Sequence, residues 1–361
     1  MIYVLHVVSG LKSGGVESML YSYYVKMDRS KIHFDFLVHG SADGLFAEKF
    51  RELGCDIYCL TPKSISVIKN FRDMFRGLSQ RNYDVVHSHI GTESFLPLSI
   101  AFFKGVNVRI AGAHCAIKPN FIAKCMRLIT SVFANNYAAC SELSAQITFN
   151  KRKGDFFLLK NGVDVQRFLF NEANRKMIRE KYDVSDNCVL LGNVGRFVWE
   201  KNQKFLIELL KKMNDGSLVE YKLMLVGSGG LKDSLQKRAE ECGVANKVLF
   251  VDPQKNIELY YSAFDFFMFP STNEGFGIVA IEAQINGLNV FASNTLSSDL
   301  CISSRYRCLN INVIDEWCDA LRKFDYRYSL ENRTNLLIDK SSYDIDELAN
   351  ELTSYYGKLV N

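Results

Sequence analysis

The feature that most constrains the fold is an alternation of short apolar runs with helical stretches, which starts again half-way along the chain. Continuous apolar strands separated by helices are typical of a parallel sheet covered by helices on both faces. Two such series in tandem predict two doubly wound, Rossmann-like α/β domains. The first series is Tyr3–Val8, Phe34–Val38, Val85–His87, Val108–Ala111 and Tyr137–Cys140, and the second is Val189–Asn193, Leu223–Val226, Val248–Val251, Phe266–Phe269 and Val290–Ala292.

The length of 361 residues allows each half its own hydrophobic core. The predicted boundaries are 1–163 for the N-terminal domain and 164–344 for the C-terminal domain. In doubly wound sheets, ligands bind beyond the carboxyl ends of the strands. Two sheets that face each other would therefore bind a ligand in a cleft between them.

The composition is that of a globular protein, with 48% hydrophobic and 23% charged residues, which excludes disordered and fibrous classes. The ten cysteines are scattered without a CxxC pair, and the chain opens on a strand rather than a secretory signal. The longest apolar stretch, Phe95–Phe103, is about half of the roughly 20 residues that a spanning helix needs. These features predict a cytoplasmic protein.

The net charge of +4 conceals an asymmetry. Residues 1–163 hold 20 basic and 12 acidic residues, which leaves 24 basic and 28 acidic residues for the remainder. A basic first half predicts an anionic partner for that half alone, and peripheral binding to an anionic membrane surface is the interpretation. No nucleic-acid partner is expected, and a homo-oligomer stays open. An ordinary solvated helix face packed on the sheet is the alternative. The helical stretches concerned carry Lys63, Lys69, Arg72, Arg76 and Arg81 among Ile65, Ile68, Phe71 and Phe75, and Lys118, Lys124 and Arg127 among Phe121, Ile122, Met126 and Ile129.

Each half also begins with a strand, a glycine loop and a helix. Gly14-Gly15 follows the first strand, and Gly195-Arg196 follows the first strand of the second half. Glycine lets backbone N–H groups approach a phosphate, and a helix N-terminus favours negative charge. Neither loop matches G-x-G-x-x-G or a Walker A sequence, which disfavours a nicotinamide-dependent oxidoreductase.

The strongest signal is the segment 270–283. The strand Phe266–Phe269 ends at Pro270, a polar turn carries Glu274, and a helix then runs toward Gly287. Glu282 lies two turns into this apolar helix, where a carboxylate is costly unless hydroxyls or a cation bind it. Two carboxylates at different depths suit the hydroxyl groups of a nucleotide sugar.

This segment resembles the Glu-x7-Glu signature of the retaining glycosyltransferases of family 4, which have the GT-B fold. The resemblance extends to Ala139–Glu142, Lys160–Asp164 and Gly195–Asn202. It implies that Glu274 contacts the transferred sugar and Glu282 the ribose of the donor, while Arg196 and Lys201 clamp the diphosphate. It also implies that the final helix, within 345–361, packs back on the N-terminal domain. The donor-binding residues that it implies are Gly14, Gly15, Gly195, Asn273, Gly275, Phe276, Gly277, Ile278 and Glu282.

The chemistry agrees with these roles, because the departing nucleotide diphosphate gains negative charge as the glycosidic bond breaks. Cations placed where that charge develops typically contribute a hundredfold or more in rate. Asp344-Ile345-Asp346 precedes a helix, so it reads as a capping pair with Glu347 rather than as a metal motif. No His, Cys or Asp cluster has metal-ligand spacing, so transfer without a metal or other cofactor is expected.

All six histidines lie at or before residue 114. His114 falls where the family often has His-x-His at a strand end, with Gly112 in place of the first histidine, and is expected to orient the donor sugar or the acceptor. His87, His89 and Ser141, also at strand ends, are candidates for lining the acceptor side. The resemblance implies that the leaving phosphate accepts the acceptor's proton, so no general base is assigned.

The sequence therefore predicts a retaining glycosyltransferase that moves a sugar from a UDP-sugar onto a saccharide, lipid-linked at the cytoplasmic membrane face, in cell-surface polysaccharide biosynthesis. GDP-mannose is the rival donor, because Asn289 and Ser298-Asp299 depart from the family pattern at the nucleotide end. A UDP-sugar epimerase or a phosphorylase of the same fold, and an inactive nucleotide-sugar-binding partner subunit, remain as alternatives.

Overall fold

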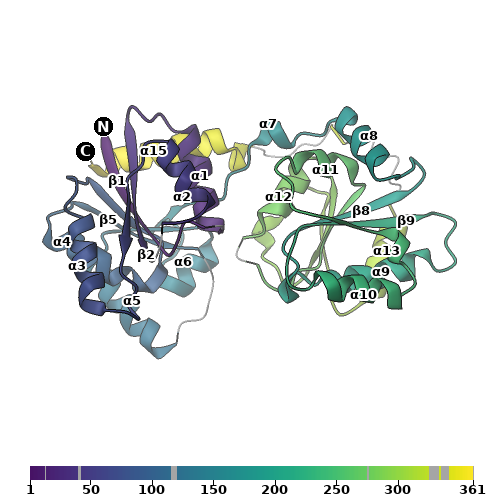
Figure 1. Cartoon of the computed structure of the whole chain (residues 1–361), viewed down its shortest axis with the longest axis horizontal. Coiled ribbons are helices and arrows are strands. Elements are labelled where there is room, and N and C mark those ends of the chain that lie inside the picture. The colour runs from purple at the N-terminus through teal and green to yellow at the C-terminus, as the bar shows by residue number, and fades with distance from the viewer. Residues whose placement is uncertain are drawn as a thin grey trace. The chain divides into compact units, whose positions relative to one another are not determined.

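The computed structural model describes residues 1–12, 14–39, 42–114, 120–274, 276–324, 333–334 and 341–360 (Figure 1). The chain divides into two compact units. Unit 1 comprises Met1–Gly162 together with Ser341–Asn361, and unit 2 comprises Val163–Lys340. The C-terminal segment therefore belongs to the same unit as the N-terminus.

Unit 1 is built on a parallel sheet of seven strands in the order β3-β2-β1-β4-β5-β6-β7. The order reverses between β1 and β4, where a doubly wound sheet has its topological switch point and binds ligands. The strands are β1 (Ile2–Val8), β2 (Ile32–His39), β3 (Ile57–Leu60), β4 (Val85–Ser88), β5 (Val108–Ala113), β6 (Asn136–Ala139) and β7 (Phe157–Leu158).

Helices cover both faces of this sheet (Figure 1). One core lies under α1, α2 and α15 and includes Tyr23, Phe34 and Tyr356, whereas the other lies under α3, α4 and α6 and includes Met74 and Leu98. Burial on both faces explains why the strands read as unbroken apolar runs. The helices are α1 (Gly15–Lys26), α2 (Leu45–Glu52), α3 (Val67–Gly77), α4 (Phe95–Phe103), α5 (Phe121–Phe133), α6 (Glu142–Phe149) and α15 (Ile345–Val360), with the 3₁₀ turns η1 (Gly91–Ser94) and η5 (Ser341–Tyr343).

Unit 2 repeats the plan with six parallel strands in the order β10-β9-β8-β11-β12-β13, reversing between β8 and β11. One of its cores packs α9, α10 and α13 on one face around the fully buried Trp317. The strands are β8 (Val189–Val194), β9 (Tyr221–Val226), β10 (Val248–Val251), β11 (Phe266–Phe269), β12 (Asn289–Ser293) and β13 (Tyr306–Leu309). The helices are α7 (Val165–Phe168), α8 (Glu172–Lys181), α9 (Gln203–Asn214), α10 (Lys232–Glu241), α11 (Glu258–Ala263), α12 (Ile278–Ile285) and α13 (Ile314–Arg322), with the 3₁₀ turns η2 (Trp199–Lys201), η3 (Ala245–Lys247) and η4 (Ser298–Leu300).

The prediction of two parallel α/β sheets is confirmed, and each of the ten predicted strands is present within one or two residues of its expected bounds. Three strands were missed: β3, β7 and β13. They lie toward or at the sheet edges and are only partly buried, so their sequences lack the continuous apolar run of a central strand.

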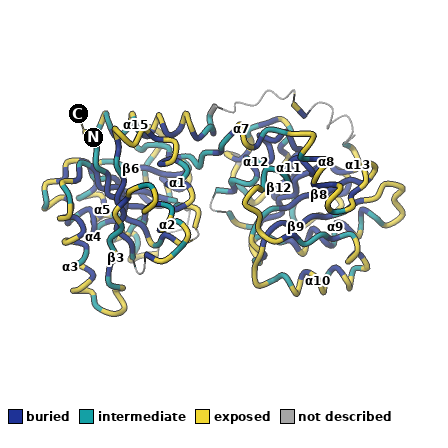
Figure 2. Tube along the Cα trace, turned by 45° about the horizontal axis from the view of Figure 1, so that its top comes forward, coloured by how far each residue is buried: buried dark blue, intermediate teal, exposed yellow. Residues whose placement is uncertain are grey.

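Exposed apolar side chains lie on α3 and α5 of unit 1. Figure 2 shows exposed residues along α3. Ile68 is 75% exposed and Phe121 is 80% exposed. Of the helices within the described ranges, none has both the length and the apolar character needed to cross a bilayer.

Candidate active site

The candidate site of unit 2 lies where β8 and β11 end. These strands are neighbours at the reversal point of the sheet, so the loops that follow them meet at one edge. The loop after β8 carries Gly195, Arg196 and Lys201, and the loop after β11 carries Asn273 and Glu274. The fold thus brings together two motifs that stand more than 70 residues apart in the sequence.

The centre of this site is an ion pair between Lys201 and Glu274. The Lys201 ammonium donates to both carboxylate oxygens, at 2.6 Å to Oε1 and 2.7 Å to Oε2. Only 18% of the lysine side chain and 11% of the glutamate side chain are exposed. Removing either partner would leave the other charge unpaired in a poorly solvated place, so each side chain stabilises the other.

A backbone hydrogen bond joins the two loops, and a side-chain hydrogen bond holds the loop after β8. The N–H of Thr272 donates to the carbonyl of Glu200 at 2.8 Å, and the Gln203 side chain donates to the carbonyl of Arg196 at 3.0 Å. Asn202 has a left-handed backbone, with φ of 52°, which turns the chain from η2 into α9. The ion pair therefore stands on a rigid support.

Arg196 is exposed at the same edge, and its guanidinium makes no ion pair with any residue that the structure describes. Its main chain is fixed through the Gln203 contact, whereas its side chain is free to reach a ligand. Arginine binds phosphate oxygens through a planar fork of donors. Arg196 can thus supply the second cation of the predicted clamp.

Sequence reasoning missed two glycines that build this loop. Gly227 has a φ of 156°, and a Cβ atom on it would lie 1.9 Å from the carbonyl oxygen of Gly195. Gly229 has a φ of 157°, and a Cβ there would lie 2.4 Å from the carbonyl oxygen of Phe197. Both positions need glycine because the backbone of the neighbouring segment packs closely against them, beneath Arg196.

Glu282 lies on α12 and is only partly exposed. The Tyr261 hydroxyl donates to Glu282 Oε2 at 2.6 Å. Desolvation raises the pKa of Glu282 to about 7, against the opposing influence of this hydrogen bond and of Arg167. A carboxyl group that is half protonated near neutral pH can both accept and donate hydrogen bonds to hydroxyls.

The remaining donor-binding candidates surround the start of α12. Asn273 is exposed and Phe276 is partly exposed. Gly277 has a left-handed φ of 85° and precedes Ile278, the first residue of the helix, which has no side-chain cap. Uncapped N–H groups at a helix N-terminus suit an anion. Gly275 lies outside the described residues.

Gly14 and Gly15 begin α1 in unit 1. Gly14 is the N-cap and Gly15 the first helical residue, both exposed. The Glu17 carboxyl folds against Gly14, where a Cβ atom would lie 2.1 Å from Glu17 Oε2. Burial raises the pKa of Glu17. A side chain at position 14 would need the end of the Glu17 side chain to move.

The structure separates the predicted histidines and Ser141 into different roles. His114 is partly exposed directly after β5, and His89 is 8% exposed. The interpretation of His87 as a residue that lines the acceptor side is wrong, because its side chain is fully buried and Nδ1 bonds to the Tyr356 hydroxyl at 2.8 Å. Ser141 caps α6 by accepting from the Ser144 N–H at 3.1 Å.

A group that the sequence spacing did not reveal joins His6, His87 and His89. One ring nitrogen of each lies within 4.8 Å of the others, close enough on distance alone for a metal ion. His6 stands 81 residues before His87, so only the sheet brings these two residues together. In the parallel pairing of β1 with β4, the α-carbons of His6 and His87 lie opposite each other.

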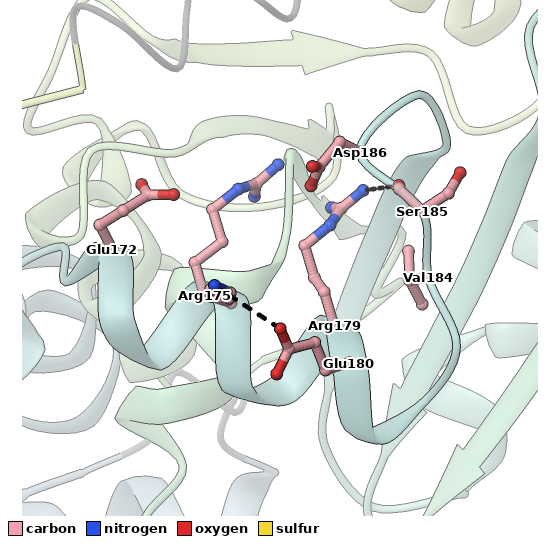
Figure 3. A pocket seen from close by; sticks show the side chains of 8 residues that line it. Glu172, Arg175, Arg179, Glu180, Val184, Ser185 and Asp186 are labelled. Atoms are coloured by element: carbon pink, nitrogen blue, oxygen red, sulfur yellow. Dashed lines mark hydrogen bonds and ion pairs between the residues drawn. The ribbon is translucent and has the colours of Figure 1, made fainter.

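A hollow of about 360 Å³ beside α8 in unit 2 is a separate feature (Figure 3). Arg175 and Arg179 line it, but their guanidinium groups bind Asp265 at 2.7 and 3.1 Å and the backbone carbonyl of Ala263. Figure 3 shows Arg179 also reaching the carbonyl of Ser185. These arginines bind α8 to the sheet and are not available to a ligand. The edge at the ends of β8 and β11 is therefore the better candidate for the active site.

Comparison with known proteins agrees with this choice. Residues 174–304, which include Arg196, Lys201, Glu274 and Glu282, match the family model described as "Glycosyl transferases group 1". This part of the chain is a glycosyltransferase group 1 domain.

Most of the chain is similar to named glycosyltransferases. The putative glycosyltransferase EpsF of Bacillus subtilis is 28% identical over 309 residues, which cover 81% of this chain and 79% of EpsF. A UDP-Gal:alpha-D-GlcNAc-diphosphoundecaprenol alpha-1,3-galactosyltransferase of Escherichia coli is 23% identical over 277 residues, 72% of this chain and 71% of that protein. These similarities and the group 1 domain identify the chain as a glycosyltransferase.

Among solved structures, Anabaena HepE in complex with UDP and glucose matches with a TM-score of 0.79 at 19% identity, covering 99% of this chain and 100% of HepE. The GT-B fold that the sequence predicts is therefore confirmed.

Proposed function

We propose that this glycosyltransferase moves a sugar from a UDP-sugar, with retention of anomeric configuration and without a metal, onto a lipid-linked saccharide in cell-surface polysaccharide biosynthesis. The observation that carries the proposal is the ion pair of Lys201 and Glu274 at the carboxyl edge of β8 and β11, inside the group 1 domain. The reaction requires a cation that binds the diphosphate and a group that accepts hydrogen bonds from the hydroxyls of the sugar. Lys201 and Glu274 provide one of each, side by side.

In this proposal Lys201 and Glu274 contact different parts of the donor when it binds. The Lys201 ammonium and the Arg196 guanidinium neutralise the diphosphate, whose charge grows as the bond to the sugar breaks. The Glu274 carboxylate accepts hydrogen bonds from the sugar hydroxyls, and Glu282 does the same for the ribose. Preorganised cations fill the role that a metal ion fills in other transferases.

The UDP donor is supported by the Escherichia coli relative, whose name includes UDP-Gal, and by the HepE structure, which is a complex with UDP and glucose. The acceptor class is supported by the diphosphoundecaprenol saccharide in the name of the Escherichia coli relative. GDP-mannose remains the alternative donor. The intact set of Arg196, Lys201, Glu274 and Glu282 favours an active transferase over a partner subunit that only binds the donor. We propose a cytoplasmic location for the chain.

The test is a thermal-shift titration with UDP, GDP, ADP and their common sugars in EDTA, followed by turnover assays with the donor that binds. A ligand at 100 times its Kd stabilises the folded state by about 2.7 kcal/mol. We expect UDP to stabilise the wild type and much less the Lys201→Ala variant, with Lys204→Ala, an exposed lysine three residues on, behaving as wild type. Stabilisation by GDP alone would replace the donor, and binding only with a divalent metal would contradict the metal-free mechanism.

Product analysis separates the remaining alternatives. Retention predicts that the anomeric configuration of the UDP-sugar reappears in the product, as read by proton NMR. Conversion of one UDP-sugar into another without an acceptor would indicate an epimerase. Binding without turnover over a panel of diphospholipid saccharides would indicate the partner subunit.

We further propose that unit 1 binds an anionic membrane through α3 and α5. On α3, Ile68 and Phe71 stand exposed beside Lys69 and Arg72. On α5, only Thr130 is fully buried, whereas Phe121 is 80% exposed. Apolar side chains interleaved with cations suit the interface of an anionic bilayer, where each basic residue contributes about 1 kcal/mol.

The structure reduces the set of predicted cations. Arg81 is held by Asp35 at 3.1 Å and Asp56 at 3.3 Å, so it is not available to a membrane. Lys63 pairs with Glu93 at 2.8 Å. Lys118 lies outside the described residues.

Co-sedimentation with vesicles tests this surface. We expect binding to phosphatidylglycerol vesicles and not to phosphatidylcholine vesicles, with at least a tenfold loss in the Phe71→Glu/Phe121→Glu variant. Leu218→Glu, which changes a fully exposed leucine of unit 2, is the matched control. Equal binding by both variants would contradict the proposed surface.

A further inference from the structure

Three histidines of unit 1 form a line of hydrogen bonds that runs from the edge of the sheet into the core. His114 Nε2 lies 2.8 Å from His89 Nδ1, and His89 Nε2 lies 2.8 Å from His6 Nδ1. His114 is partly exposed, His89 is 8% exposed and His6 is fully buried. We call these residues the histidine line.

The sheet itself builds the histidine line. His6 on β1 lies opposite His87 on β4, and side chains two residues apart on a strand share a face, which places His89 on the same side. The His89 N–H continues the ladder by donating to the carbonyl of Val7 at 2.8 Å. Room is provided by Gly112 on β5, where a Cβ atom would lie 3.4 Å from His89 Nδ1 and 2.9 Å from the carbonyl oxygen of Ser88.

Neutral histidines in such a line must all share one tautomer. Burial lowers the pKa of each ring, that of His114 to about 4, so each carries one N–H and one lone pair. If the His89 hydrogen lies on Nδ1, it bonds to His114 Nε2, and the hydrogen toward His89 Nε2 must come from His6 Nδ1. The opposite choice puts all three hydrogens on Nε2.

The buried end of the line decides between these two states. His6 Nε2 has no hydrogen-bond partner among the described residues and is shielded from solvent. In the all-Nε2–H state this atom would be an orphaned buried N–H group, which is rarer in proteins than an unpaired acceptor. The all-Nδ1–H state leaves only a bare lone pair there, so it is favoured.

We propose that His6 and His89 are positioning residues that hold His114 as the Nδ1–H tautomer. His114 then offers an N–H group to an oxygen of a bound ligand, while its lone pair is already occupied by His89. It acts as a neutral hydrogen-bond donor and not as a general base. The oxygen in question, a sugar hydroxyl or a phosphate oxygen, rests on the proposed function, whereas the tautomer does not.

A metal ion held by His6, His87 and His89 is the competing interpretation of the same cluster. Both nitrogens of His89 already take part in the histidine line. The rings of His6 and His89 are nearly coplanar, with 25° between their planes, and their facing nitrogens are 2.8 Å apart. Two nitrogens that face each other at hydrogen-bond distance leave no room for an ion between them, so the geometry favours the hydrogen-bonded line.

The experiment is nitrogen NMR of the full-length, ligand-free protein labelled with ¹⁵N-histidine. We expect His6, His89 and His114 each to show a protonated Nδ1 and a bare Nε2, with ¹⁵N–¹⁵N couplings across both hydrogen bonds. In His89→Phe the coupling at His114 should disappear and its ring should populate both tautomers. His39→Gln, which removes a histidine outside the line, should leave the other signals unchanged.

Each outcome bears on the proposal without any substrate. A bare Nδ1 on His114 in the wild type, or absent couplings, would overturn it even if His89→Phe does not fold. An unchanged His114 tautomer in folded His89→Phe would show that His89 does not position the ring. Loss of the couplings on stoichiometric Zn²⁺ addition would favour the metal site instead. Because no donor is present, these results stand apart from success or failure of the proposed glycosyl transfer.

Discussion

At the scale of single residues, the site depends on charges held in poorly solvated places. Lys201 and Glu274 pair at 2.6 Å with little exposure, and Glu282 keeps a carboxyl group beside the Tyr261 hydroxyl at 2.6 Å. Each of these groups is costly to the free protein unless it is paired. Charged groups in poorly solvated positions are typical of sites that bind a ligand or catalyse a reaction.

Substitution of Lys201 tests the role of the pair. We expect Lys201→Ala to lower kcat by about a hundredfold, because it removes a cation from the point where the leaving diphosphate gains charge. Lys204→Ala is the control for the loss of one lysine. Steady-state kinetics on folded variants measure the effect, and wild-type turnover in Lys201→Ala would refute the assignment.

Glu282 should make stability depend on pH in a defined direction. Its pKa of about 7 lies above the ordinary value of 4.5, so the folded protein prefers the protonated form and loses stability as pH rises from 4.5 to 7. Glu282→Gln keeps an acceptor for Tyr261 and removes the charge. We expect it to match the wild type at pH 4.5 and to exceed it at pH 8 by about 2 kcal/mol, after allowance for partial exposure.

Urea denaturation at the two pH values provides the measurement. Glu240→Gln on α10, where the side chain is exposed, is the matched control. A difference that is equal at both pH values would show that Glu282 is not the group that titrates.

At the scale of elements, the packing of β4 against β5 determines which residue can stand at position 112. The family resemblance places a histidine there, but the carbonyl of Ser88 and the ring of His87 occupy the space that a side chain would need. The departure from the family pattern thus has a steric cause within the sheet. His87 in turn is fixed by the Tyr356 hydroxyl of α15.

Gly112→Ala should therefore be destabilising. A Cβ atom 2.9 Å from a backbone carbonyl forces the strands apart, and overpacking of this kind costs about 1–3 kcal/mol. Gly10→Ala, where nothing lies within 4 Å of the added atom, should change the free energy of unfolding little. Thermal and urea unfolding of both variants measure the contrast, and equal stability would contradict the described packing.

At the scale of the whole molecule, the chain passes out of unit 1 at Gly162 and returns to it at Ser341. The returning helix α15 buries Leu348, Leu352 and Tyr356 in the core shared with α1 and β2. The stability of the N-terminal strands and helices therefore depends on the C-terminal helix. Unit 2 has its own core around Trp317.

Leu352→Ala should loosen unit 1 selectively. Truncation of a fully buried leucine costs about 2–5 kcal/mol, and a local defect affects the cooperative unit that contains it. Hydrogen exchange should show faster exchange throughout β1, β2 and α1, hundreds of residues away in sequence, and unchanged protection in β8 and β9. Leu218→Ala is the control, and equal loss of protection in both units would show that they unfold as one.

The sequence by itself determined the two parallel sheets and the strands near their centres. It did so because a strand that is buried on both faces must be apolar at every position, a local requirement that is visible without neighbours. The sequence around Glu274 and Glu282 likewise predicted these carboxylates as site residues. The family resemblance added Arg196 and Lys201 to the predicted site.

Only the tertiary structure decided which of these residues meet. The bonding of Lys201 to Glu274, the burial of His87 and the line from His114 through His89 to His6 all depend on strand order, which brings together residues far apart in the chain. The edge strands and the packing glycines Gly112 and Gly227 escaped prediction for the same reason. Their constraints come from atoms of other segments, and spacing along one chain does not record such contacts.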